Sequence, residues 1–132
     1  MIELVKNEEI VYCIIIRSNY NKEGANFFTE QSDRMQIGSL NYKKGKLIEP
    51  HFHKKISRVS QKCAETIFIK KGKLKVNFYN SKNFDFLEYK ILGPNDVMLI
   101  NDGAHGFEVI DDVEMIEVKL GPYRSDDLVR RK

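Results

Sequence analysis

The segment ETIFIKKGKLKVNFY, residues 65–79, carries the pattern that decides the fold of this chain. Its second half alternates between apolar and polar residues, so Leu74, Val76 and Phe78 share one face of a strand. The dipeptide at residues 71–72, Lys-Gly, interrupts this alternation. The segment therefore predicts two β-strands with a hinge at residues 71–72.

Further strands are predicted on both sides of this segment, with turn signals between them. The run IVYCIIIR, residues 10–17, is apolar and β-branched, which is typical of a strand buried on both faces. Other candidates are FDFLEYKIL at 84–92, VMLI at 97–100, FEVI at 107–110, VEMIEVKL at 113–120 and a segment near Ile37 and Leu40. Turns are predicted at 18–26, 93–96 and 101–106. We expect an all-β sandwich or barrel with little helix, the helical candidate being the tail at 125–132.

Length and composition limit the domain count and the class of function. The chain has 132 residues, 42% of them hydrophobic, which predicts a single domain over 1–132. Its net charge of +3 comes from scattered lysines, whereas nucleic-acid binders usually gather positive charge on one face. We therefore expect no nucleic-acid partner. Because the sequence shows no membrane-length apolar run and no signal-type start, we also expect a cytoplasmic protein with no membrane partner.

The three histidines of the chain are His51, His53 and His105, and two of them are separated by a single residue. On a strand, His51 and His53 would point to the same face, as a pair of metal ligands requires. Glu65 begins the next clear strand, and His105 follows a tight turn. Three imidazoles and one carboxylate suit one divalent transition metal ion, Fe, Mn, Ni or Zn.

The residues around these ligands resemble the two motifs of the cupin superfamily. Gly45 lies six positions before His51, and Glu65 lies seven before Gly72, so that GKLIEPHFH and ETIFIKKG match the first motif. The segment GPNDVMLINDGAHG, ending near His105, resembles the second. The chain departs from the family in the long spacer at 54–64, which must loop out, and in NDGAH, which replaces the usual Pro-x-Gly-x-x-His.

This resemblance covers about residues 36–120 and implies the cupin-like double-stranded β-helix, a jelly-roll barrel. It also implies that His51, His53, Glu65 and His105 bind the metal. More narrowly, the chain is similar to small single-domain cupins found near enzymes of surface-polysaccharide and nonulosonic-acid biosynthesis. Segments such as EPHFH, HGFE and IEVKLGPY carry that similarity.

Several functions remain open at this stage. One is a metal-dependent enzyme acting on a small oxygenated molecule such as a sugar or sugar acid, by isomerase, epimerase or dioxygenase chemistry. Another is a barrel that binds a sugar or small anion without chemistry. A third is a metal-independent isomerase of sugar nucleotides that uses a histidine as acid or base. The fold does not choose among them.

Residues beside the predicted ligands are candidates for substrate binding. Arg58 and Gln61 lie on the long spacer, and the Arg58 guanidinium suits a carboxylate or phosphate. Tyr42 is the third candidate. Glu108 is expected on the strand face opposite His105, away from the site. The apolar strand VYCIII, residues 11–16, is a candidate surface for a homodimer.

Overall fold

The computed structural model describes residues 1–57, 63–124, 126 and 128–131. These residues form two compact units, Met1–Tyr20 with Lys62–Lys132, and Asn21–Gln61. Each unit is described by itself below. The strands are β1 (Ile2–Asn7), β2 (Ile10–Ile16), β3 (Gly24–Phe27), β4 (Gly38–Asn41), β5 (Glu65–Tyr79), β6 (Phe86–Leu92), β7 (Val97–Ile100) and β8 (Ala104–Lys119).

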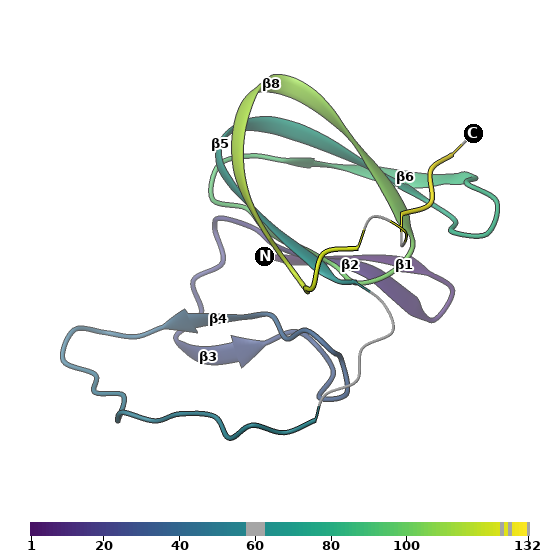
Figure 1. The fold of residues 1–132 in the computed structure, drawn as a ribbon. Helices are drawn as coiled ribbons and strands as arrows, with labels where there is room; N and C mark the ends of the chain where they lie inside the picture. The colour runs from purple at the N-terminus through teal and green to yellow at the C-terminus, as the bar shows by residue number, and fades with distance from the viewer. Residues whose placement is uncertain (58–62, 125, 127, 132) are drawn as a thin grey trace. The chain divides into compact units, whose positions relative to one another are not determined.

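The larger unit is one antiparallel sheet of six strands, which curls strongly into a half-barrel (Figure 1). Its strand order is β1-β2-β7-β5-β6, and β8 pairs with β5. The first part of β5 pairs with β7 and the second part with β6, while β8 accompanies β5 along almost its whole length. The all-β expectation is therefore confirmed.

The core lies on the inner face of this curled sheet. Leu74, Val76 and Phe78 are each 0% exposed, so the face predicted from the alternation is the buried one. Twelve buried residues form the core cluster: Val5, Tyr12, Cys13, Ile15, Ile67, Ile69, Leu74, Val76, Phe78, Leu92, Met98 and Ile100. In β2 four consecutive residues from 12 to 15 are buried, as predicted for a strand covered on both faces.

The predicted hinge at residues 71–72 lies inside one continuous strand of 15 residues, so the expectation of two separate strands is wrong. The chain bends there without ending the strand, because the register with β8 shifts at three places between Ile69 and Leu74. Gly72 has φ +91, and a Cβ atom at this position would lie 2.0 Å from the carbonyl oxygen of Asp112. Only glycine fits where β5 and β8 approach so closely.

The smaller unit contains a two-stranded sheet, β3 paired with β4. β4 matches the strand expected near Leu40, but β3 lies where the sequence predicted a turn. Gly24 starts β3 with φ +90 and lies opposite Asn41. Pairing with β4 therefore overrides the turn-rich composition. In the tail, residues 128–131 are not helical, and Ser125, the expected helix cap, lies outside the described residues.

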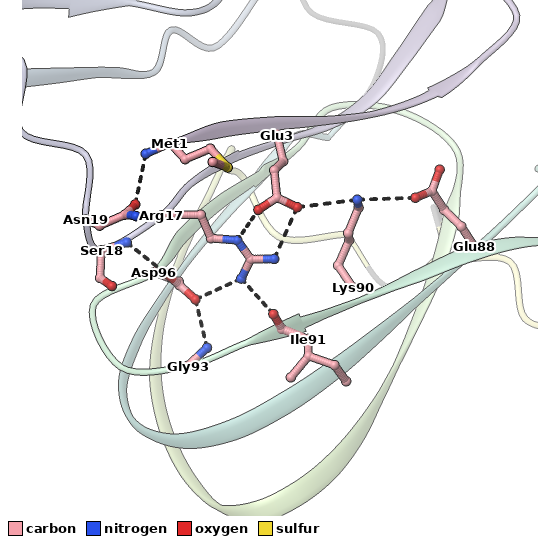
Figure 2. A network of polar contacts seen from close by, with 10 residues as sticks. All are labelled: Met1, Glu3, Arg17, Ser18, Asn19, Glu88, Lys90, Ile91, Gly93 and Asp96. Atoms are coloured by element: carbon pink, nitrogen blue, oxygen red, sulfur yellow. Dashed lines mark hydrogen bonds and ion pairs between the residues drawn. The ribbon is translucent and has the colours of Figure 1, made fainter.

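A network of charged side chains joins the two ends of the strand order in the larger unit (Figure 2). Arg17, just after β2, forms an ion pair with Glu3 on β1 and a second, at 3.0 Å, with Asp96 before β7. Its Nη1 also donates a 2.7 Å hydrogen bond to the carbonyl of Ile91 on β6. Lys90 on β6 lies 3.4 Å from Glu3. Side chains thus link β1 and β6, which share no backbone pairing.

Candidate metal centre

Two of the four predicted metal ligands, Glu65 and His105, lie together in the larger unit. Glu65 is the first residue of β5 and shares a strand face with the buried Ile67. His105 is the second residue of β8 and lies directly opposite the buried Phe78. Because opposite residues of an antiparallel pair share a face, both side chains lie on the inner face of the half-barrel.

The polar atoms of these two side chains face one another. His105 Nε2 lies 3.4 Å from Glu65 Oε2, and the two side chains are 25% and 22% exposed. This separation is longer than an ordinary N–H···O hydrogen bond. It equals the separation of about 3.4 Å between a nitrogen and an oxygen ligand of one tetrahedral zinc ion. One imidazole and one carboxylate at this spacing fit a divalent transition metal.

His105 owes its position to the turn that precedes it. Gly103 has φ +76, and a Cβ atom there would lie 2.1 Å from the ring of Tyr12. The turn also bonds to the core strand, since the backbone nitrogen of Asn101 donates to the carbonyl of Tyr12 at 2.8 Å. NDGAH therefore forms a tight turn packed on β2, although it lacks the proline of the cupin motif.

A second acidic residue, Glu117, lies next to Glu65 on the same sheet face and was not predicted from the sequence. It lies on β8 opposite Ile67, one step along the inner face from Glu65. The nearby His105 imidazole lowers the pKa of Glu65, whereas burial and then the charge of Glu65 raise the pKa of Glu117. The alternation of Met115, Glu117 and Lys119 was the available signal. Within the described ranges, no group of three or more His, Cys, Asp or Glu side chains is arranged to hold a metal ion.

The other two predicted ligands, His51 and His53, belong to the smaller unit. The prediction that they lie on a strand is wrong, since residues 42–57 contain none. Pro50 lacks a backbone donor, and residues 42–57 pair with no strand among the described residues. Their rings are nevertheless close, with centroids 5.6 Å apart at an interplanar angle of 81°.

The tautomer of His51 is set by a local contact. His51 Nδ1 lies 2.9 Å from the carbonyl oxygen of Glu49, so Nδ1 carries the proton and donates it. This leaves Nε2 with a free lone pair, which is the form in which histidine binds metals. His51 and His53 are both exposed.

The predicted substrate-binding residues have different outcomes. Tyr42 is 38% exposed just after β4, and the Lys46 ammonium lies 5.8 Å from the centre of its ring. Arg58 and Gln61 lie outside the described residues. Glu108 accepts a 2.7 Å hydrogen bond from Asn77. Asn77 lies on the face of β5 opposite the core, so Glu108 lies on the other face of β8 from the predicted ligands, as expected.

Comparisons with known proteins leave the chain without an assigned family. No protein-family model matches it, and no curated protein or solved structure gives a significant match. Among the described residues, no helix has the length and apolar character needed to cross a membrane.

Proposed function

We propose that this protein is a metal-binding cupin that acts on a small oxygenated molecule, such as a sugar or a sugar acid. In this proposal one divalent ion, Fe, Mn, Ni or Zn, is bound by Glu65 and His105 together with His51 and His53. The observation that carries the proposal is the 3.4 Å approach of His105 Nε2 to Glu65 Oε2 on the inner face of the half-barrel.

The ligand roles follow from the chemistry of each side chain. Glu65 supplies an anionic oxygen, and its lowered pKa keeps it ionised, as a metal ligand must be. His51 supplies Nε2, because its Nδ1 is held by the Glu49 carbonyl. A bound ion of this class supplies Lewis-acid activation of a carbonyl or hydroxyl group, or a docking point for dioxygen.

The apolar residues near Glu65 and His105 have a separate role. The ring of Phe107 lies 5.4 Å from the His105 ring and shares its strand face. Ile67 and Phe78 are buried beside the two polar side chains. Apolar surroundings exclude water and strengthen electrostatic interactions with a bound substrate.

A second function, metal-independent acid–base catalysis on a sugar nucleotide, is favoured by a different observation. His105 Nδ1 is buried and has no hydrogen-bond partner among the described residues. A metal on Nε2 would require the proton on Nδ1, where it would lack an acceptor at a cost of about 1–3 kcal/mol. With the proton on Nε2, His105 donates toward Glu65 instead, as in an acid–base pair.

Metal content distinguishes the two functions. Untagged protein purified without added metal should contain close to one equivalent of transition metal by plasma mass spectrometry. The variants His105→Ala, Glu65→Ala and the double variant His51→Ala/His53→Ala should each lose it while remaining folded. Glu108→Ala removes a carboxylate on the other face of β8 and should retain it.

The alternative predicts a different pattern. If wild-type protein holds no metal and takes none up from Fe(II), Mn(II), Ni(II) or Zn(II), the metal proposal fails. Sugar nucleotides should then raise the melting temperature of wild-type protein, and His105→Ala should abolish that shift. Absence of both metal and any nucleotide-induced shift would reject both functions.

A further inference from the structure

The outer face of the curled sheet carries a group of aromatic side chains that the proposed function does not use. On β5, Tyr79 follows the buried Phe78 and therefore points away from the core. On β6, Phe86 lies directly opposite Tyr79, and their rings meet edge to face at 6.0 Å. Tyr89 lies opposite Asn77, another outward residue of β5. Phe86 and Tyr89 are 56% and 53% exposed, and exposed apolar groups that lie together often mark a binding surface.

A carboxylate on the same outer face is held in a fixed position. Glu108 on β8 accepts a 2.7 Å hydrogen bond from Asn77 Nδ2 and lies 3.4 Å from Lys75 Nζ. Asn77 is only 8% exposed, so its amide is itself fixed by packing, whereas the Glu108 side chain is 56% exposed. Both contacts are made to Oε2 of Glu108. Its Oε1 is therefore oriented by these contacts and left to accept hydrogen bonds from a ligand.

We propose that these residues form a binding site for a neutral saccharide, called here the aromatic platform. The platform consists of the rings of Tyr79, Phe86 and Tyr89 together with the Glu108 carboxylate. The C–H groups of a sugar ring pack against the large apolar faces of aromatic side chains. Sugar hydroxyl groups donate hydrogen bonds, and an ionised carboxylate accepts them at both oxygens. The Arg131 guanidinium lies 5.1 Å from the centre of the Tyr79 ring and supplies donors for sugar oxygens.

The charges of the platform favour a neutral ligand. The Lys75 ammonium lies 3.4 Å from Glu108 and 4.7 Å from the centre of the Tyr89 ring, so the charges of Lys75 and Glu108 offset each other. A nucleic-acid strand also stacks bases on aromatic rings, but Glu108 would repel its phosphates. A second copy of this chain would have to strip water from the Lys75–Glu108 pair, which costs free energy. Sugar hydroxyl groups replace that water instead.

The aromatic platform is separate from the candidate metal centre. Glu108 and His105 point to opposite faces of β8, because their positions differ by an odd number of residues within one regular stretch of pairing with β5. Saccharide binding on the platform therefore does not rest on the proposed function. His105→Ala should lose the metal and keep saccharide binding, so that failure of one proposal is distinguished from failure of the other.

Five variants test the platform. Tyr89→Ala and Phe86→Ala each remove one exposed ring, and Glu108→Gln removes the charge of the acceptor while keeping its shape. Tyr123→Ala is the control for the rings, because Tyr123 is 81% exposed and lies beyond the end of β8. Glu114→Gln is the control for the carboxylate, because Glu114 is 57% exposed on the same strand and pairs with Lys70 and Lys71. Thermal unfolding of each variant checks that it is folded.

The probe is an array of neutral oligosaccharides built from hexose and N-acetylhexosamine units. Calorimetry with the glycan that binds most tightly then gives the Kd of each variant. Tyr89→Ala and Phe86→Ala should each weaken binding about tenfold, because each removes a stacking surface. Glu108→Gln should weaken it by about tenfold as well, because a hydrogen bond to a charged acceptor becomes a neutral one. Tyr123→Ala and Glu114→Gln should match wild type.

Four results would overturn the inference. One is that wild-type protein binds no neutral glycan of the array, and another is that Tyr89→Ala, Phe86→Ala and Glu108→Gln all keep the wild-type Kd. A third is binding of an oligothymidylate but of no glycan, which would assign the platform to nucleic acid. The fourth is a dimer in sedimentation velocity that binds no glycan and that Tyr89→Ala dissociates, which would assign the platform to a second copy of the chain.

Discussion

Arg17→Met tests whether the charged network, rather than the apolar core alone, holds β1 to β6. Methionine keeps the length and apolar stem of the side chain but removes every donor. Arg17 is 22% exposed and reaches Glu3, Asp96 and the carbonyl of Ile91. The substitution therefore breaks two ion pairs and one hydrogen bond without opening a large cavity.

The magnitude follows from what each partner keeps. Removing one member of a buried ion pair costs about 3–5 kcal/mol. Here the loss is smaller, because Glu3 still has Lys90 at 3.4 Å. Asp96 also still accepts hydrogen bonds from the backbone nitrogens of Ser18 and Gly93, at 2.9 and 2.8 Å. We expect the free energy of unfolding to fall by about 2–3 kcal/mol.

Urea denaturation followed by circular dichroism measures this loss, with an unchanged m-value showing that the same surface is exposed on unfolding. Arg124→Met is the matched control, since Arg124 pairs with Asp126 at 2.7 Å on the surface and contributes little. A loss for Arg17→Met below about 1 kcal/mol would refute the reasoning, since a buried pair should cost more. So would a loss no greater than that of Arg124→Met.

The network also predicts a pH dependence. The pKa of Glu3 is lowered, chiefly by its hydrogen bond with Arg17. A carboxylate of this kind contributes stability above its unfolded-state pKa and loses it as the pH falls through the folded-state pKa. The stability difference between wild type and Arg17→Met should therefore be full at neutral pH and shrink on acidification. A difference that grows in acid would contradict this assignment.

Three further substitutions or treatments have defined outcomes. Phe78 belongs to the fully buried face of β5, so Phe78→Ala should lower the free energy of unfolding in urea by about 3–5 kcal/mol. A loss below about 1 kcal/mol would contradict the placement of Phe78 in the core. Gly103→Ala should lower the free energy of unfolding by about 2 kcal/mol or more in the same assay, because its Cβ would meet the Tyr12 ring. Gly121→Ala is the control, because no atom lies near its Cβ. Chelation of a metal present at 100 times its Kd should lower stability by about 2.7 kcal/mol, seen as a lower melting temperature; no change would argue against a bound ion.

The sequence predicts the core strands well because their side-chain alternation is local. Leu74, Val76 and Phe78 carry a period of two that only a half-buried strand produces. Non-local pairing is harder to predict. Gly24–Phe27 has a turn-like composition and becomes a strand because β4 supplies its hydrogen bonds. Likewise, the bend at Gly72 depends on the approach of Asp112 from a distant part of the chain.

The candidate site is predictable where residue type alone indicates the chemistry. Glutamate and histidine are residue types that bind metals, so Glu65 and His105 could be named as candidates from the sequence. The fold brings the two side chains together. The alternation of Met115, Glu117 and Lys119 puts Glu117 on one strand face, but its place next to Glu65 depends on the register of β5 with β8. The prediction that His51 and His53 lie on a strand was wrong. The spacing of two histidines does not determine whether their backbone pairs with another strand.

X-ray absorption spectroscopy at the metal edge tests the central claim most directly, because it counts the imidazoles bound to the ion. Wild-type protein loaded with one equivalent of Zn(II) should show imidazole scattering from His105, His51 and His53 with an oxygen ligand. His105→Ala should lose one imidazole from that shell. A zinc shell without imidazole, or one unchanged in His105→Ala, would contradict the proposed metal centre.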